Sequence, residues 1–189
     1  MLNLITNLTR KIENYSLKTG FVYSLACKYY HSVIEKEIAL ANITANDHIL
    51  CIGGGICPFS AILFHQTTGA RVTVIDNNSK CVKKAQQVID KLGINEKVHV
   101  YHQDGNSQNI MFADYTVIHF ALQVCPMEHV FFNVERQAVD GTRLLVRRPK
   151  KQLDNMYCHI NCLSPCNPHA AHRARNIGST IMYTKKATA

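Results

Sequence analysis

Three adjacent glycines form the part of the chain best suited to bind a cofactor. Gly53, Gly54 and Gly55 follow the apolar run 48–52, and Pro58 comes three residues later. Glycine adopts backbone dihedrals closed to other residues and lets a ligand approach the main chain, while proline fits the first turn of a helix. The pattern predicts a nucleotide-cofactor turn between a strand and a helix. A tight strand-to-helix connection without a ligand needs similar residues and is the alternative interpretation.

Acidic residues follow the next two predicted strands. Asp76 ends the second strand and lies 21 positions after Gly55, where doubly wound sheets hold a ribose. A carboxylate at this place can accept both ribose hydroxyls. Asp104 and Gly105 follow the third predicted strand.

Strands alternate with helices from about residue 47 onward. Apolar periodicity and turn residues predict strands at 48–52, 71–76, 98–101, 115–120, 142–147 and 179–184. Helices are predicted between them at 58–67, 79–92 and 126–139. Two further helices, at 3–15 and 21–40, are predicted before the first strand. Gly69, Gly93 and Gly141 each lie shortly after a helical run and are predicted to end it. The pattern predicts a Rossmann-like, doubly wound α/β fold with a mostly parallel sheet, two leading helices and a final antiparallel strand.

Length and composition narrow the class of protein. The chain has 189 residues, of which 47% are hydrophobic, which suits one domain with a sizeable core. No apolar run approaches the roughly 20 residues that span a bilayer, and the amino terminus lacks the features of a signal peptide. We therefore expect a cytoplasmic protein without a membrane partner. Eight cysteines without an export signal predict reduced thiols rather than disulfides.

The formal net charge of +8 leaves several partners open. The positive charge is concentrated late in the chain, at Arg143, Arg147, Arg148, Lys150, Lys151, Arg173, Arg175, Lys185 and Lys186. A solvated basic face is favoured, an anionic small substrate is the next alternative, and nucleic acid is the least favoured because no long basic helix with interleaved aromatic residues is present. A homo-oligomer also stays open.

The order of these motifs resembles the class I S-adenosylmethionine-dependent methyltransferases from about residue 47 to the end. The resemblance implies that the glycine turn passes under the methionine part of the cofactor, that Asp76 binds the ribose, and that Asp104 lies by the adenine amino group. The implied cofactor-binding residues are Gly53, Gly54, Gly55, Asp76, Asn77, Asp104, Gly105 and Phe120. Cys51 and Cys57 stand where this family usually has an acid and a third glycine. A third glycine is also missing from the pattern of nicotinamide-binding dehydrogenases, so that class is less favoured.

The same turn has a second resemblance. Residues 53–60 read Gly-Gly-Gly-Ile-Cys-Pro-Phe-Ser and are similar to the Gly-x-Gly-x-x-Pro-x-Ser turn of nicotianamine synthase-like enzymes, while 141–147 resembles their fifth strand. Those enzymes use the same cofactor but transfer its aminocarboxypropyl group. The resemblance implies this transfer as the closest alternative to methyl transfer.

The acceptor is expected at the carboxyl ends of the strands, close to the end of the fourth strand. His119 lies there and can take a proton from an acceptor hydroxyl or amine. The favoured alternative is that His119 only packs between its neighbours in the strand. Residues 121–124 lack the Asn/Asp-Pro-Pro-aromatic sequence of the amino-methylating nucleic-acid enzymes, so a small-molecule acceptor is favoured.

The residues before the first strand often fold over the cofactor in this family. We therefore expect a single methyltransferase-like domain over 1–189, with a helical lid at 1–46 and a Rossmann-like core at 47–189. The lid residues that could shape the acceptor pocket are Tyr23, Tyr29, Tyr30 and Glu35. The alternative for each is a place on a packed amphipathic helix face.

A cluster of cysteines and histidines lies between residues 158 and 172. Cys158, Cys162, Cys166 and His169 are the candidate metal ligands, because thiolates and imidazoles bind zinc and related metals. Their spacing differs from the paired Cys-x2-Cys of common structural zinc sites, so a loop with partly buried cysteines is favoured and a bound metal is not expected. A non-catalytic metal- or cofactor-binding module is a third interpretation of the whole chain, behind the two transferases.

Overall fold

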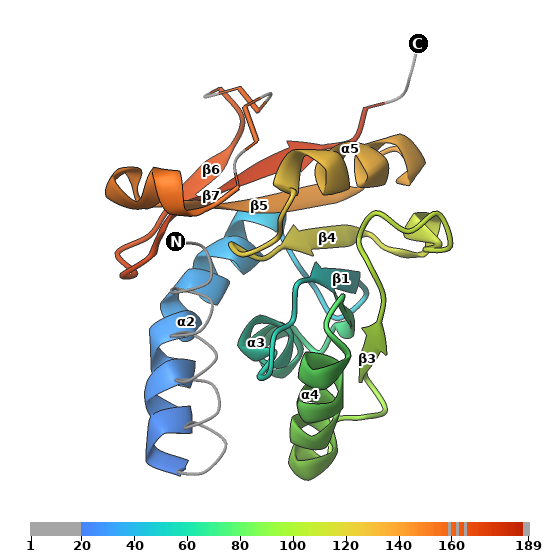
Figure 1. Cartoon of the computed structure of the whole chain (residues 1–189), viewed down its shortest axis with the longest axis vertical. Coiled ribbons are helices and arrows are strands. Elements are labelled where there is room, and N and C mark those ends of the chain that lie inside the picture. The colour runs from blue at the N-terminus through green and yellow to red at the C-terminus, as the bar shows by residue number, and fades with distance from the viewer. Residues whose placement is uncertain (1–19, 159, 162, 165, 187–189) are drawn as a thin grey trace.

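A seven-stranded sheet organises the protein. The computed structural model describes residues 20–158, 160–161, 163–164 and 166–186, with side chains described from residue 27 onward. Across this part of the chain the strand order is β3-β2-β1-β4-β5-β7-β6 (Figure 1). The strands are β1 (His48–Ile52), β2 (Arg71–Asp76), β3 (Val98–His102), β4 (Val117–Phe120), β5 (Arg143–Pro149), β6 (His169–Ala171) and β7 (Ile177–Thr184).

Strand direction confirms the predicted Rossmann-like fold. β1 pairs in parallel with β2 and β4, and the parallel pairs β2–β3 and β4–β5 extend the sheet on either side. β7 runs antiparallel to β5, as predicted for the last strand. The chain crosses over at β1 and β4, so their carboxyl ends form the edge at which doubly wound sheets bind ligands.

Helices cover both faces of the sheet. α2 (Gly20–Ala41), α3 (Phe59–Thr68) and α4 (Ser79–Leu92) lie on one face, and α5 (Met127–Gln137) lies on the other (Figure 1). Alternate residues of β1 divide between two cores: Ile49 packs with the residues of α3 and α4, and Leu50 packs with those of α5. This alternation follows from the two-residue period of a strand. The predicted helix at 3–15 lies outside the described residues.

Glycine ends two of the helices as predicted. Gly69 and Gly93 have φ angles of 75° and 66° and cap α3 and α4 in the left-handed conformation. The prediction for Gly141 is wrong, because α5 already ends at Gln137 and the capping position is Ala138. Gly141 instead turns the chain into β5, and its amide donates a 2.9 Å hydrogen bond to the carbonyl of Lys185.

The structure contains three short elements that the sequence pattern did not predict. They are the 3-10 helices η1 (Phe112–Asp114) and η2 (Lys151–Met156), and the strand β6. β6 has only three residues, and its pairing with β7 defines it. Short elements of this kind lack a periodic pattern of their own, so tertiary pairing decides them.

A disulfide joins Cys125 to Cys158. It joins the loop after β4 to the segment after η2. The expectation of fully reduced thiols is therefore wrong for this pair. Within the described residues, no helix is long and apolar enough to cross a membrane.

Three of the late cations pair with acids from other parts of the chain. Arg143 pairs with Asp47, Arg147 with Glu37, and Lys185 with Glu135. Arg147 is only 4% exposed, so it belongs to the core rather than to a solvated basic face. The sequence shows where these charges occur in the chain, but not that acids far away in sequence neutralise them.

Candidate active site

The turn after β1 requires glycine at each of its three positions for a different reason. Gly53 and Gly55 have φ angles of 87° and 65°, which side chains disfavour. A Cβ atom added to Gly54 would lie 2.2 Å from Cγ1 of Val74, so the neighbouring strand leaves no room for a side chain there. The turn thus presents bare main chain at the carboxyl edge of the sheet, as predicted.

Asp76 lies against this turn. Its Oδ2 accepts a 2.8 Å hydrogen bond from the amide of Gly55, and its Oδ1 accepts one of 2.9 Å from the amide of Asn78. The side chain is half-buried. The sequence predicts a ligand contact for Asp76, and the structure adds that this carboxylate also shapes the glycine turn.

The loop after β3 carries the next two predicted residues, Asp104 and Gly105. Asp104 is exposed, and Gly105 is buried with its carbonyl accepting a 3.1 Å hydrogen bond from Nδ2 of Asn133. A Cβ at Gly105 would lie 2.7 Å from Cγ1 of Val130, so α5 packs directly on this loop. Asn77 is exposed and follows Asp76 at the same edge.

The two predicted residues of β4 are buried. Phe120 is fully buried and packs against Phe131, with ring centroids 5.8 Å apart. A cofactor contact by Phe120 would therefore involve its main chain. His119 is 1% exposed on the opposite face and packs on Phe64 at 5.5 Å between ring centroids. This burial favours the packing alternative for His119, whose catalytic role stays a prediction.

A buried polar network surrounds His119. Arg147 donates from Nε and Nη2 to the two carboxylate oxygens of Glu37, both at 2.8 Å. Arg147 also donates from Nη1 to Oγ of Ser60 at 2.9 Å. Thr180 donates to Glu37 at 2.6 Å and lies 2.8 Å from Nε2 of His172. The network joins α2, the start of α3, β5 and β7.

Burial and charge set the protonation states of this network. Burial alone would raise the pKa of Glu37, but Arg147, His119 and the hydrogen bonds outweigh it and lower the pKa to about 2. Burial, together with nearby Arg147, lowers the pKa of His119 to about 3. Glu37 is therefore charged and His119 neutral at neutral pH. Neither ring nitrogen of His119 has a hydrogen-bond partner among the described residues, and Nε2 lies 3.6 Å from Glu37 Oε2.

Sequence reasoning missed Glu37 and selected Glu35 instead. Glu35 is exposed and lies 3.4 Å from His31 on the outer face of α2. Glu37 is completely buried on the face that also carries Val33 and Ile34. An acid within an apolar helical stripe is the signal that could have identified it.

Two of the predicted lid residues, Tyr29 and Tyr30, pack into the protein. Tyr30 stacks on Phe59 with centroids 5.5 Å apart, and Tyr29 OH accepts a hydrogen bond from the amide of Asn176. Both tyrosines are half-buried. Tyr23 belongs to α2, but its side chain lies outside the description.

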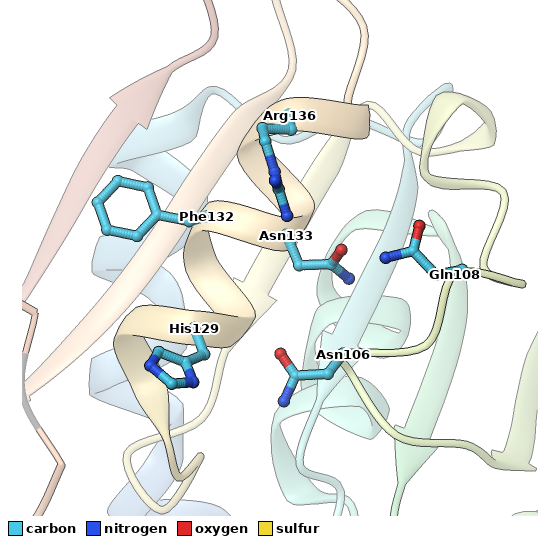
Figure 2. Close-up of a pocket in the computed structure, with 6 residues that line it drawn as sticks. All are labelled: Asn106, Gln108, His129, Phe132, Asn133 and Arg136. Carbon is cyan, nitrogen blue, oxygen red and sulfur yellow. The ribbon is translucent and has the colours of Figure 1, made fainter.

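A surface cavity borders the loop that follows Gly105. Asn106 and Gln108 of this loop face Asn133 and Arg136 of α5, and His129 and Phe132 complete the lining (Figure 2). The lining does not include the glycine turn or Asp76. This cavity therefore borders the side of the site where the adenine is predicted, and the glycine turn lies outside it.

The candidate metal ligands are not brought together as a described cluster. Cys158 forms the disulfide, Cys166 and His169 are exposed, and Cys162 lies outside the described residues. Among the residues that the structure describes, no group of three or more His, Cys, Asp or Glu side chains could hold a metal ion.

Comparisons with solved structures identify the fold. An RNA methyltransferase from Salinibacter ruber in complex with S-adenosyl-L-homocysteine is 17% identical, with 84% of this chain and 93% of that chain covered and a TM-score of 0.66. A mutant of the nicotianamine synthase MtNAS in complex with S-adenosylmethionine is 21% identical, with 98% of this chain and 74% of that chain covered and a TM-score of 0.78. MtNAS in complex with MTA and tNA is 22% identical, with 98% of this chain and 72% of that chain covered and a TM-score of 0.78. No curated protein matches the chain.

The cofactor-side geometry fits the family that the chain matches. The bare glycine turn, the carboxylate of Asp76 beside it and the exposed Asp104 are the features expected for S-adenosylmethionine. The family model described as protein-L-isoaspartate(D-aspartate) O-methyltransferase (PCMT) matches residues 16–155. The chain therefore belongs to the PCMT family of S-adenosylmethionine-dependent methyltransferases.

Proposed function

We propose that this enzyme transfers a methyl group from S-adenosylmethionine to a small acceptor that carries a carboxylate. The observation that carries the proposal is a group of cations at the carboxyl end of β5, the strand that pairs with β4, at whose end we expect the acceptor. When bound, the cofactor supplies an activated methyl group. The chain's own task is then to orient the acceptor and exclude water, which requires few acid or base residues.

The cations come from two segments that meet at this edge. The amide of Lys150 donates a 3.0 Å hydrogen bond to the carbonyl of Asn176, which joins the end of β5 to the hairpin between β6 and β7. Lys151, Arg173 and Arg175 are exposed there. Exposed cations around an acceptor site favour anionic molecules by electrostatic steering.

An apolar cluster lies beside these cations. Its buried members are Val33, Leu122, Tyr157, Ala174 and Ile177, with Tyr29 and Tyr30 packed against them. This arrangement supports an acceptor that has an apolar part and a charged end. The family description names an aspartate-type acid as acceptor in proteins, and a carboxylate is the chemical feature that we carry over to this chain.

Product analysis tests the proposal. The purified enzyme is incubated with S-adenosylmethionine and a panel of small carboxylic acids, each paired with its neutral amide, and S-adenosylhomocysteine is measured by chromatography with mass detection. Turnover with acids and not with the amides supports the proposal. Equal turnover with acids and amides contradicts it. Arg173→Ala and Arg175→Ala should raise the KM of the acceptor, and Arg71→Ala, an exposed arginine at the start of β2, is the matched control.

Aminocarboxypropyl transfer is the second candidate function. The observations that favour it are the turn Gly53-Gly54-Gly55-Ile56-Cys57-Pro58-Phe59-Ser60 and the similarity to MtNAS over 98% of this chain. The same assay separates the two reactions, because methyl transfer yields S-adenosylhomocysteine and aminocarboxypropyl transfer yields methylthioadenosine. Methylthioadenosine formed in proportion to acceptor consumption would replace our first proposal with this one.

The remaining expectations are proposals of lower rank. They are a single domain with 1–46 as a lid, a cytoplasmic location, a homo-oligomer, and a metal at Cys158, Cys162, Cys166 and His169. The disulfide removes Cys158 from this metal set until it is reduced. Metal analysis of protein purified without a histidine tag, with and without reductant, tests the last of them.

A further inference from the structure

The glycine turn is held at two points. At its first point, Asp76 accepts the hydrogen bond from Gly55. At its second, Ser60 in the first turn of α3 receives the hydrogen bond from Arg147. Ser60 is the last residue of the eight-residue motif that begins at Gly53. Arg147 thus contacts the end of the segment whose glycine turn is predicted to contact the cofactor.

Arg147 is itself fixed by α2. Glu37 binds two of its donors with both carboxylate oxygens, a bidentate geometry that fixes the plane of the guanidinium as well as its distance. The ring of Tyr30, also on α2, lies 5.8 Å from the guanidinium carbon. Tyr30 additionally stacks on Phe59, the neighbour of Ser60. Two residues of α2 therefore reach the start of α3, one through Arg147 and one directly.

We propose that Arg147 is a positioning residue for the cofactor turn, and that α2 sets the affinity for S-adenosylmethionine through the chain Glu37, Arg147 and Ser60. α2 is then a fixed part of the cofactor site instead of a cover that acts only on the acceptor. This proposal depends on the binding of S-adenosylmethionine, which is part of the proposed function, and does not depend on the identity of the acceptor.

The use of a buried ion pair between Glu37 and Arg147 supports a positioning role for Arg147. A buried ion pair contributes little net stability compared with apolar residues of similar size, because desolvation offsets the attraction. Here both partners are 4% exposed or less, and the third guanidinium nitrogen, Nη1, donates to the half-buried Ser60 in the first turn of α3. The ion pair orients the hydrogen bond from Arg147 to Ser60. A pair of apolar side chains at positions 37 and 147 could not form such a directional contact.

The affinity for S-adenosylhomocysteine, measured by titration calorimetry well below the unfolding temperature, tests this role without an acceptor. Ser60→Ala removes only the hydroxyl that Arg147 contacts, and we expect about fivefold weaker binding, as for the loss of one hydrogen bond. Ser60→Thr keeps the hydroxyl and should restore the wild-type affinity. Ser32→Ala, an exposed serine on α2, is the matched control and should change nothing.

A double variant separates positioning from folding. Glu37→Leu with Arg147→Met removes both charges at similar volume, so the protein is expected to keep its melting temperature while binding S-adenosylhomocysteine as weakly as Ser60→Ala. If Ser60→Ala lowers the melting temperature but leaves the affinity unchanged, the network is only structural and the proposal is overturned. An incorrect acceptor assignment leaves all of these affinities as expected, so the two proposals fail separately.

Discussion

The carboxylate of Asp76 and the amide of Gly55 are joined by a 2.8 Å hydrogen bond between residues 21 positions apart in the chain. The parallel pairing of β1 with β2, in which Ile52 lies opposite Ile75, places the two strand ends side by side. The carboxylate that is predicted to bind the ribose is therefore already oriented by an amide of the glycine turn. Shape and charge of the site depend on the same contact.

Replacing Asp76 should weaken cofactor binding more than it weakens the fold. Asp76→Ala removes a charged hydrogen-bond acceptor and leaves the amide of Gly55 unbonded, and the expected loss is about 1.5–3 kcal/mol, or roughly 10- to 100-fold in affinity for S-adenosylhomocysteine. Calorimetry measures it. Asp140→Ala, at an exposed turn before β5, is the control. Unchanged affinity in Asp76→Ala would remove this residue from the site.

Gly54→Ala should destabilise the protein because the new methyl group would lie 2.2 Å from Val74. Overpacking of this kind costs about 1–3 kcal/mol, which thermal unfolding detects. Gly54→Ala should cost less stability in a Val74→Ala background than in the wild type, because the smaller neighbour makes room. An equal cost in both backgrounds would show that the clash with Val74 is not the cause.

His119 should make stability depend on pH. Its pKa is lowered to about 3 in the folded state by burial, from an ordinary value of 6.5. Between these values the unfolded chain binds a proton that the folded chain does not, so stability falls as the pH drops from 6.5 toward 3, by up to about 1.4 kcal/mol per pH unit.

His119→Leu removes this proton uptake. We expect the free energy of unfolding, measured with urea at pH 7 and pH 5, to change less in the variant than in the wild type. The variant should also fold well, since it removes two buried nitrogens without hydrogen-bond partners in the described structure. An equal change in both proteins contradicts the assignment. Loss of turnover with unchanged cofactor affinity would instead support the catalytic role predicted from sequence.

The disulfide should stabilise the fold by closing a long loop. Cys125 and Cys158 are separated by 33 positions, for which loop-closure entropy gives about 3–4 kcal/mol. Reduction with dithiothreitol should therefore lower the melting temperature of the wild type. The double variant Cys125→Ser with Cys158→Ser should melt at the lower temperature and be insensitive to the reductant. A melting temperature that reductant does not change in the wild type would count against this linkage.

The sequence by itself determined the order of the main elements and the position of the glycine turn and of Asp76 at neighbouring strand ends. Local signals sufficed there: apolar runs for the strands, Gly69 and Gly93 at helix ends, and Gly53, Gly55 and Asp76 at strand ends. These residues lie close to the strand ends that they serve, and parallel pairing brings those ends together whatever the details of packing.

Tertiary structure alone decided the buried network, the short strand β6 and the disulfide. From the sequence alone, Arg147 cannot be distinguished from the exposed cations near it. Only the packing of α2 against β5 brings it to Glu37, which lies 110 positions away in the chain. The same holds for β6, which exists through its pairing with β7, and for the disulfide. The sequence does not show which distant residues pair: an acid within an apolar helical stripe marks Glu37 as unusual, but nothing local names Arg147 as its partner. The free energy that selects these contacts comes from burial and charge pairing in the assembled core.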